Sequence, residues 1–360
     1  MKIIFVCTKS ITFNTFLKSQ ASYFSKMGFK INVACSDIEN LKLKKKTNHL
    51  ISFPLSFFDL INILKYIKIF FQIKNLVKTN KSNIFYLHTP VASFFFRFFS
   101  MFYDLKIIYF VHGFRFTSKT NFFQSIFFKA IENILSFKNK IIITINNEDY
   151  HYAKTNLLHK VPTYKINGVG LNLKKIYVNN KINYKNEIKK IIVIAAYKNS
   201  KGYLDLIKLA EILNSYFLKI DCYGYGDYKK YQSLKIKKKL TNITFKKFDK
   251  NLKRKIKSYD LLLHLSKREG LPVSVMECLY NGLPVICYEI RGNKDLIIDG
   301  YNGFFVKSYK DVPNRIFYLN LEKSIFYKMR INAFNSISKN FSNAEINSKI
   351  CKIIKKNFII

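Results

Sequence analysis

Residues 260–277 read DLLLHLSKREGLPVSVME, and this stretch decides the fold. The apolar run Leu261–Leu265 is typical of a parallel strand that is buried on both faces. A tight Glu-Gly-Leu-Pro turn follows, and Pro272 suits the first position of a helix, where a missing N–H costs nothing. Strand, glycine turn and helix N-terminus together predict an α/β fold that presents free backbone N–H groups to a phosphate.

Two glutamates frame this turn. Glu269 lies in the turn itself, at the carboxyl end of the predicted strand, where ligands bind in open parallel sheets. Glu277 is expected roughly a turn and a half into the helix. The competing interpretation is that Glu269 is an ordinary turn residue and that Glu277 only serves an exposed helix face.

The whole stretch resembles the signature of the retaining GT-B glycosyltransferases that use nucleotide-sugar donors, the group 1 or family 4 type found in capsule and exopolysaccharide synthesis. The resemblance implies that Glu269, as a catalytic residue, contacts the donor sugar and that Glu277 hydrogen-bonds the ribose. It also implies that the diphosphate is held by backbone N–H groups between the glutamates. These further donor-binding residues are Gly270, Leu271, Pro272 and Val273.

Apolar runs of strand length alternate with helical patterns along both halves of the chain, which predicts two doubly wound parallel sheets. The first helix is expected over Phe13–Met27, with Gly28 as its stop. The strands expected in the first half are Ile3–Cys7, Ile31–Cys35, Ile84–His88, Ile107–Val111 and Ile141–Ile145. Those expected in the second half are Ile191–Ala195, Leu218–Tyr223, Ile243–Phe248, Leu261–Leu265, Pro284–Tyr288 and Phe304–Val306.

A chain of 360 residues is too long for one ordinary core, so two domains are expected. We predict an N-terminal acceptor domain over 1–170, an Asn- and Lys-rich linker over 171–189, and a nucleotide-sugar-binding domain over 190–340. The resemblance implies that two Rossmann-like domains face each other across a cleft. It also implies that residues 341–360 form a helix that packs back on the N-terminal domain.

Two histidines lie at the carboxyl ends of predicted strands of the first domain, at the ligand edge of the sheet: His88 ends one strand and His112 directly follows another. His112 precedes a glycine, and the resemblance implies that it meets the donor sugar as a second catalytic residue. His88 begins a His-Thr-Pro sequence and is expected to face the acceptor side. A purely structural role remains the alternative for each of them.

Cationic residues near the diphosphate are expected after the first strand of the second domain. Lys201 and Gly202 match the end of the family pattern Gly-Arg-Leu-x-x-x-Lys-Gly, but Ala196 stands where the family has the arginine. Lys201 is therefore expected to bind the phosphates, with Lys198 as a substitute point charge. Asn293, in a Gly-Asn turn at a predicted helix start, is a further donor-binding candidate, and helix capping is its alternative role.

The formal net charge of +40 is extreme, and the lysines are spread along the whole chain. An AT-rich genome would account for much of this composition, and the remainder implies attraction to anionic membrane surfaces. A specific nucleic-acid complex is not expected, because the charge is scattered and no recognition motif is present.

No run is long and uncharged enough for a membrane span. The six cysteines form no C-x-x-C pair and predict buried, reduced thiols.

We therefore predict a metal-independent retaining glycosyltransferase without cofactor, cytoplasmic and peripheral to the inner face of the cell membrane. It would move a hexose or N-acetylhexosamine from a UDP-sugar to a lipid-linked oligosaccharide acceptor. A GT-B epimerase or phosphorylase keeps the fold and changes the reaction. The alternative outside catalysis is a basic protein that binds membrane surfaces or nucleic acid.

Overall fold

The computed structural model describes all residues except 44–47, 55–62, 81–82, 118–119, 174–186 and 359–360. The described chain forms two compact α/β units. The N-terminal unit comprises Met1–Gly170 together with Asn343–Ile360, and the C-terminal unit comprises Leu171–Ser342. Most of the predicted linker at 171–189 lies outside the described residues, as does the start of the apolar stretch Phe57–Ile73.

The N-terminal unit is built on a parallel sheet that has seven strands within the described residues, in the order β3-β2-β1-β4-β5-β6-β7. Every pairing is parallel; Ile3, for example, stands opposite Ile31 and Ile84. The strands are β1 Lys2–Val6, β2 Lys30–Cys35, β3 His49–Leu50, β4 Ile84–Leu87, β5 Lys106–Val111, β6 Ile141–Thr144 and β7 Thr163–Lys165. The sequence predicts five of them to within a residue or two and misses the short edge strands β3 and β7.

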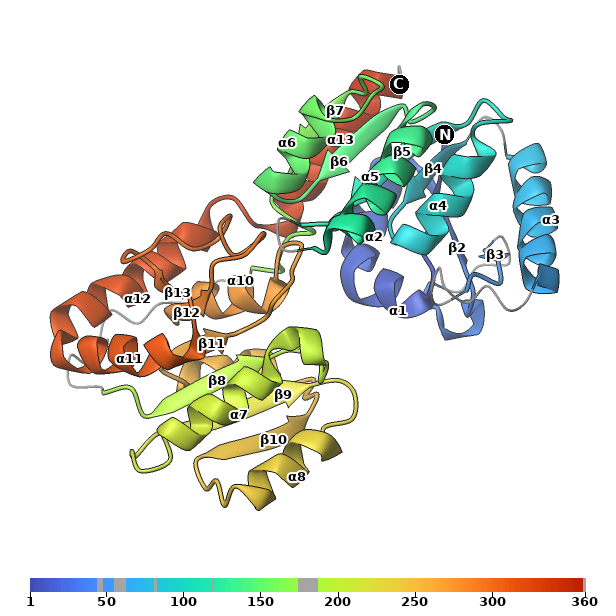
Figure 1. The fold of residues 1–360 in the computed structure, drawn as a ribbon. Coiled ribbons are helices and arrows are strands. Elements are labelled where there is room, and N and C mark those ends of the chain that lie inside the picture. The colour runs from blue at the N-terminus through green and yellow to red at the C-terminus, as the bar shows by residue number, and fades with distance from the viewer. Residues whose placement is uncertain (44–47, 55–62, 81–82, 118–119, 174–186, 359–360) are drawn as a thin grey trace. The chain divides into compact units, whose positions relative to one another are not determined.

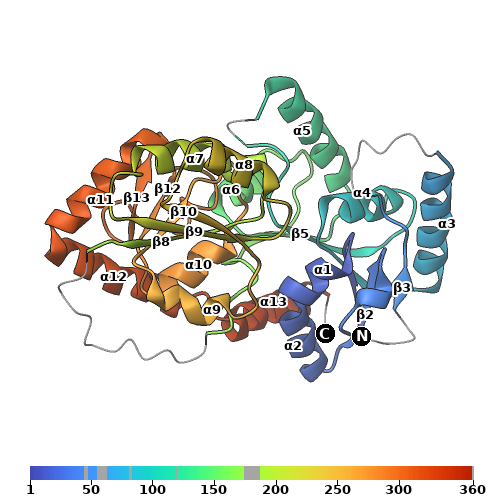
Figure 2. The ribbon, with the colours of Figure 1, turned by 90° about the horizontal axis from the view of Figure 1, so that it is seen from below.

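Helices cover both faces of this sheet (Figure 2). Side chains alternate along β1, so Phe5 packs on Phe13 and Phe24, whereas Ile4 and Val6 join the core on the opposite face. The helices are α1 Ser10–Thr12, a π-helical turn Phe13–Leu17, α2 Lys18–Lys26, a 3₁₀ turn Ile38–Asn40, α3 Ile63–Thr79, α4 Pro90–Phe99, α5 Phe122–Ser136, α6 Asn147–Thr155 and α13 Asn343–Phe358.

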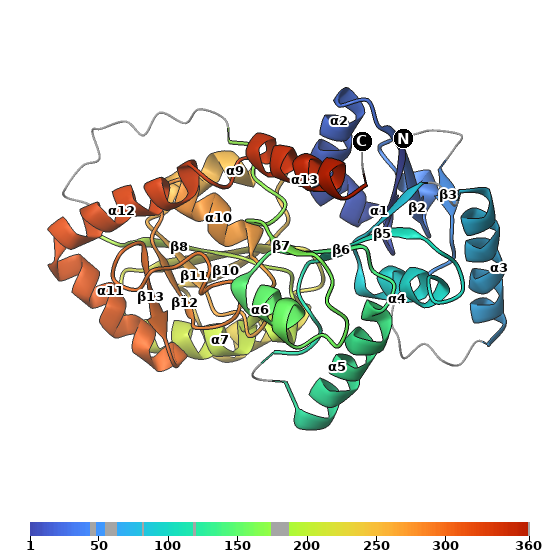
Figure 3. The ribbon, with the colours of Figure 1, turned by 90° about the horizontal axis from the view of Figure 1, so that it is seen from above.

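The C-terminal helix α13 belongs to the N-terminal unit, where it lies beside α2 (Figure 3). Its apolar stripe of Ile346, Ile350 and Ile354 is completely buried. The amide of Asn357 donates a hydrogen bond to the hydroxyl of Tyr164 on β7, with 3.1 Å between nitrogen and oxygen. The helix thus closes one face of the sheet from the far end of the sequence.

The C-terminal unit repeats the plan with a parallel sheet that has six described strands, in the order β10-β9-β8-β11-β12-β13. All six agree with the strands expected from the sequence, with ends that differ by a residue or two. The strands are β8 Lys190–Ile194, β9 Lys219–Gly224, β10 Ile243–Lys247, β11 Leu261–His264, β12 Val285–Tyr288 and β13 Gly303–Val306.

Helices α7 and α8 cover one face of this sheet, and α9 and α10 lie on the other (Figure 2). Ile191 and Val193 pack into the core with Leu206 of α7, while the intervening Ile192 is equally buried on the opposite face. The elements are the 3₁₀ turns Asn199–Lys201, Ile256–Ser258 and Tyr309–Asp311 and the helices α7 Tyr203–Ile212, α8 Lys229–Lys237, α9 Leu252–Lys255, α10 Val273–Tyr280, α11 Val312–Leu321 and α12 Lys323–Ser338.

The cysteines, the apolar helices and the segment near Asn293 also bear on predictions made from the sequence. All six cysteines are buried, and none is in a disulfide. Among the described helices, none combines the length and the apolarity that crossing a membrane requires. The helix predicted to start near Asn293 is not formed, and residues 291–296 make a series of turns instead.

Candidate active site

The strand order of the C-terminal sheet places three charged side chains at one edge. Lys201 follows β8, Glu269 follows β11 and Arg291 follows β12, and these three strands are neighbours. Because all of them are parallel, their carboxyl ends meet at the same edge, which is where open α/β sheets bind ligands. Figure 1 shows β8, β11 and β12 together in the C-terminal unit.

An ion pair joins the first two of these residues. The ammonium Nζ of Lys201 lies 2.6 Å from Oε1 of Glu269, and the two side chains are only 22% and 13% exposed. Nε2 of the buried His264, the last residue of β11, lies 3.4 Å from the same carboxylate oxygen. Burial alone would raise the pKa of the Glu269 carboxyl, but its contacts with His264 and Lys201 outweigh burial and lower the pKa to about 2. Glu269 is therefore a carboxylate throughout the physiological pH range.

Arg291 holds the turn that carries Glu269. Its Nε donates a hydrogen bond to the backbone carbonyl of Glu269, with 3.1 Å between nitrogen and oxygen, and its side chain is buried. Gly292 then passes so close to this turn that a Cβ on it would lie 2.3 Å from the carbonyl oxygen of Gly270. The loop after β12 thus supports the loop after β11.

Gly202 allows Lys201 to reach the site. Its backbone has φ +77°, and a Cβ on it would lie 1.9 Å from the carbonyl oxygen of Leu265, the residue directly after β11. The backbone N–H of Lys267 donates to the carbonyl of Ser200, which ties the two loops together at 2.9 Å. Only a glycine at 202 lets the β8 loop approach β11 this closely.

Substituting Gly202 with alanine should therefore destabilise the C-terminal unit by about 3 kcal/mol or more, since left-handed strain and a backbone clash act together. Gly28 is the matched control: its φ is +89°, but a Cβ there would meet nothing within 4 Å. Gly28→Ala should cost only the conformational strain, about 1–2 kcal/mol. Urea unfolding of both variants measures the difference, and equal costs would contradict the close approach.

Helix α10 begins directly after the Glu269 turn, with Pro272 at its N-cap. No described side chain caps this end and its first turn carries no acidic residue, so the first backbone N–H groups can be offered to an anion. Leu271 and Pro272 are buried and Val273 is half-buried. The turn presents its backbone more than its side chains, as phosphate binding requires.

Two weaker donor-site candidates differ in their placement. Lys198 is exposed in the β8 loop, directly before the 3₁₀ turn Asn199–Lys201. Asn293 is completely buried, and its Nδ2 donates to the carbonyl of Tyr288 at 2.9 Å. That bond gives the Asn293 side chain a loop-closing role, while its buried Oδ1 has no hydrogen-bond partner among the described residues.

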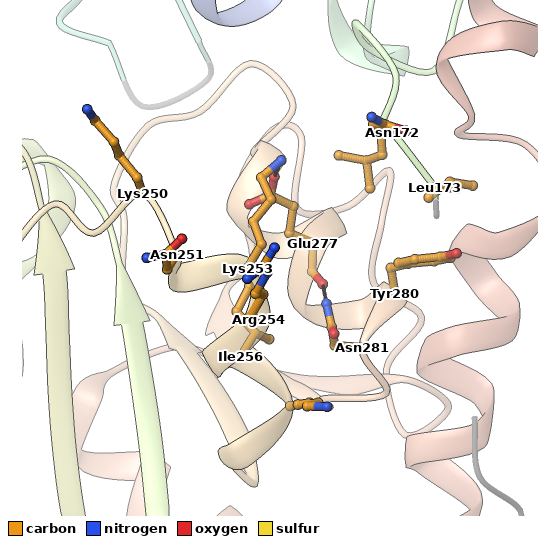
Figure 4. A pocket seen from close by; sticks show the side chains of 12 residues that line it. Asn172, Leu173, Lys250, Asn251, Lys253, Arg254, Ile256, Glu277, Tyr280 and Asn281 are labelled. Atoms are coloured by element: carbon orange, nitrogen blue, oxygen red, sulfur yellow. Dashed lines mark hydrogen bonds and ion pairs between the residues drawn. The ribbon is translucent and has the colours of Figure 1, made fainter. Parts of the chain in front are cut away.

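Glu277 lines a cavity of about 580 Å³ within the C-terminal unit. Its Oε1 pairs with Nζ of Lys253 at 2.6 Å. Figure 4 shows Lys253 and Arg254 of α9 on the side of the cavity that faces Glu277 of α10. Lys250 and Lys257 complete a strongly basic lining, and a cavity of this size is in the range that small ligands occupy.

His88 and His112 lie together in the N-terminal unit. Nδ1 of His88 is 3.1 Å from Nε2 of His112. The His88 ring is buried and stacks on Phe5, with ring centroids 5.7 Å apart. The sequence predicts that His88 faces the acceptor, but the structure places it behind His112, where it can orient that ring.

One arrangement of the protons suits this pair best. Nε2 of His88 is buried without a hydrogen-bond partner among the described residues, and a buried unpaired N–H is rarer than an unpaired acceptor. We therefore assign the proton of His88 to Nδ1, which donates it to Nε2 of His112. The neutral His112 then carries its own proton on Nδ1 and offers it as a donor.

The pair should make the N-terminal unit sensitive to acid. Burial lowers the pKa of His112 from 6.5 to about 4, and burial and His112 lower the pKa of His88. The unfolded chain therefore binds these protons at a higher pH than the folded chain. Stability should fall as the pH drops from about 6.5 to about 4, by about 3 kcal/mol for His112 alone.

Hydrogen exchange of β4 and β5, corrected for intrinsic rates, measures this loss. The variant His112→Asn should flatten the pH dependence, whereas His151→Asn, at an exposed position of α6, should leave it unchanged. Protection of β4 and β5 that stays constant between pH 7 and 4 would contradict the assignment of two buried neutral rings.

Two residues around Glu269 escape prediction from the sequence. His264 carries no motif and Arg291 is not among the predicted donor-site residues, yet both contact the Glu269 loop. Their position in the sequence could have indicated them, because each residue stands at or just after the carboxyl end of a central strand. Among the described residues, no three His, Cys, Asp or Glu side chains come together as metal ligands.

Comparison with known proteins identifies the family. The profile described as "Glycosyl transferase 4-like" matches residues 2–146, and "Glycosyl transferases group 1" matches residues 178–320. EpsD of Bacillus subtilis, which is named as a putative glycosyltransferase, is 28% identical over 324 residues, or 85% of this chain and 83% of EpsD. The poly(glycerol-phosphate) alpha-glucosyltransferase of the same species is 26% identical over 169 residues, 44% of this chain and 24% of its own.

Solved structures share the fold. The Anabaena protein HepE, crystallised with UDP and glucose, aligns over 99% of this chain and 100% of its own with a TM-score of 0.76 at 15% identity. WaaG, a glycosyltransferase involved in lipopolysaccharide biosynthesis, aligns over 98% of this chain and 99% of its own, with a TM-score of 0.71 at 15% identity. Two parallel α/β units, the two profile matches and these relatives show that the chain belongs to the group 1 glycosyltransferases and is an enzyme of the GT-B fold.

Proposed function

We propose that this glycosyltransferase moves a hexose or N-acetylhexosamine from a UDP-sugar to a lipid-linked glycan, with retention of configuration, in the synthesis of a surface polysaccharide or lipooligosaccharide. The observation that carries the proposal is the buried ion pair of Lys201 and Glu269 at the carboxyl ends of β8 and β11. The pair places a cation and an anion together at the ligand edge of the sheet, and their charges match those that develop on the two sides of a breaking sugar–phosphate bond.

The chemistry assigned to this pair follows from charge. As the bond between the anomeric carbon and the phosphate oxygen breaks, positive charge grows on the sugar and negative charge on the departing diphosphate. Glu269 would balance the first, while Lys201 and the N–H groups at the start of α10 would stabilise the second. The acceptor hydroxyl would bond to the anomeric carbon on the face that the phosphate leaves, and its proton would pass to the phosphate oxygen.

We propose that the nucleoside of the donor lies at the basic cavity beside Glu277, whose second carboxylate oxygen can accept from ribose hydroxyls. UDP as the nucleotide is supported by HepE, whose structures contain UDP and UDP-glucose. A glycan acceptor of surface-polysaccharide or lipooligosaccharide synthesis is supported by WaaG, which is described as involved in lipopolysaccharide biosynthesis, and by the poly(glycerol-phosphate) alpha-glucosyltransferase. Lys201 and the α10 N-terminus supply positive charge, so we propose transfer without a metal ion. The role of His112 on the donor sugar stays a prediction.

A donor screen tests the proposal. The purified protein is incubated with UDP- and GDP-sugars and a lipid extract, and released nucleotide and labelled glycolipid are measured with and without EDTA. We expect activity with a UDP-sugar, unchanged by EDTA. Calorimetry should show UDP binding that weakens about tenfold in Lys201→Met, as expected for loss of a charge-assisted contact. Binding of GDP but not UDP, or a requirement for metal, would overturn the corresponding part.

A further inference from the structure

The cavity beside Glu277 continues along helix α10, away from the pair of Lys201 and Glu269. Glu269 precedes the helix, whereas the helical residues that line the cavity lie from its middle to just past its end, at Glu277, Tyr280 and Asn281. Because a helix rises 1.5 Å per residue, the far end of the cavity lies about 12 Å along α10 from the N–H groups assigned to the diphosphate. The diphosphate of the donor therefore does not reach this far end.

Cations dominate the wall of the cavity that faces α10 (Figure 4). Lys253 and Arg254 come from α9, Lys257 comes from the 3₁₀ turn that follows it, and Lys250 comes from the loop before it. Among the described residues that line the cavity, Glu277 is the only carboxylate, and it already pairs with Lys253 at 2.6 Å. Four cations and one carboxylate give the lining a net charge of +3.

Three of these cations are not neutralised by the described protein. Lys255 on the same helix shows the contrast, since its ammonium pairs with Asp249 at 2.6 Å. No described carboxylate forms an ion pair with Lys250, Arg254 or Lys257. Like charges that are neighbours on one helix repel each other and lower its stability. An anion bound among them would remove this repulsion.

The composition of the chain does not explain this wall. A bias towards AT-rich codons enriches lysine, but Arg254 is one of only seven arginines in 360 residues. A guanidinium is the side chain that binds phosphate oxygens with two parallel hydrogen bonds. The cations also stand over buried apolar side chains of Leu171, Ile256 and Tyr280, where charges are screened less than on an open surface.

The nucleoside of the donor does not supply the missing negative charge. Its ribose and base are neutral, and its two phosphates are assigned to the start of α10 and to Lys201. A neutral group gains little from three unpaired cations, whereas a diphosphate places several negative oxygens within reach of them. The lining therefore fits a second, anionic ligand beside the nucleoside.

We propose that this cavity binds a di- or polyphosphate anion in addition to the nucleotide of the donor. Arg254 and Lys257 hold neighbouring phosphate groups of this ligand, and Lys253 is shared between the ligand and Glu277. The inference rests on the proposed function only where it places the nucleoside beside Glu277, because the charge of the lining is independent of the reaction.

The test is calorimetric titration of pyrophosphate into the full-length protein, both free and saturated with UDP, which fills the donor site. Wild-type protein should still bind pyrophosphate when UDP is present. Arg254→Ala combined with Lys257→Ala should weaken this binding at least tenfold, as expected for the loss of two charge-assisted contacts. The matched control combines Lys229→Ala with Lys237→Ala, which removes two exposed lysines of α8 and should leave binding unchanged. Circular dichroism checks that both variants are folded.

Two results would overturn the anion site. One is complete loss of pyrophosphate binding in the presence of UDP, which would mean that the donor diphosphate site is the only one. The other is equal pyrophosphate binding by the two variants, which would mean that the overall positive charge attracts the anion. Failure of the proposed function gives a different result. If the protein binds no UDP, but binds pyrophosphate in a way that depends on Arg254 and Lys257, the anion site stands and the proposed function fails.

Discussion

Glu269→Gln is expected to lower the rate of sugar transfer about 100- to 1,000-fold, the loss found when one preorganised electrostatic group is removed from an active site. The substitution keeps the shape of the side chain and its ability to accept from Lys201, but it removes the negative charge. That charge is available at every pH of interest, because contacts with His264 and Lys201 hold the pKa of Glu269 at about 2 despite burial. The loss should therefore appear in kcat and change little between pH 6 and 8.

Initial rates with the best donor of the wild-type enzyme measure this effect. Glu289→Gln is the matched control, since Glu289 is an exposed glutamate of the same unit that pairs with Lys294 at 3.1 Å. The control should retain full activity and UDP affinity. If Glu269→Gln kept more than half of the wild-type rate, the carboxylate would have no part in the reaction, and the site would have to be sought elsewhere on the sheet edge.

Arg97→Met should destabilise the N-terminal unit by about 3–5 kcal/mol, the cost of leaving one member of a buried ion pair without its partner. Arg97 is 2% exposed, and Glu132 would lose the contact that neutralises it. The carbonyls of Glu132 and Leu135 would also lose their guanidinium donor. The helix that would loosen first is α5, since only two of its residues are buried.

Urea unfolding followed by circular dichroism measures the loss, and hydrogen exchange of α5 locates it. Pairing Arg97→Met with Glu132→Gln should recover part of the stability, because the second change removes the unpaired charge. The variant Arg330→Met is a comparison within the C-terminal unit. There the Nε of Arg330 donates a hydrogen bond to the carbonyl of Gly282 at 3.3 Å. A loss below 1 kcal/mol in Arg97→Met would contradict the structural importance of the pair.

Much of the fold can be predicted from the sequence because parallel sheets leave a strong local signal. Strands buried on both faces read as apolar runs, and such runs locate every described strand except two. The exceptions are the short edge strands β3 and β7, because His49–Leu50 and Thr163–Lys165 carry no such run. The helix start predicted near Asn293 is wrong, because the buried bond from Asn293 to Tyr288 holds a turn there and is a contact that no periodic pattern contains.

Only part of the candidate site can be predicted from the sequence, because its contacts join residues that no local pattern connects. Lys201 and Glu269 follow strands that are far apart in sequence, and only the resemblance to a family motif joins them. His264 and Arg291 carry no pattern of their own. The sequence predicts that His88 faces a ligand because it ends a strand, but whether a strand-end side chain points outwards or stacks inwards on Phe5 depends on packing.

By itself the sequence determined the class of fold and the edge of each sheet where ligands would bind, because hydrophobic period and glycine position act locally along the chain. Only the tertiary structure decided which charges meet. The order of β8, β11 and β12 sets the contact of Lys201 with Glu269, and the packing of α4 on α5 leaves apolar side chains of α5, Phe122 and Phe123 among them, exposed. Contacts of this kind depend on distances between residues that are remote in sequence, and these distances exist only once the chain is folded.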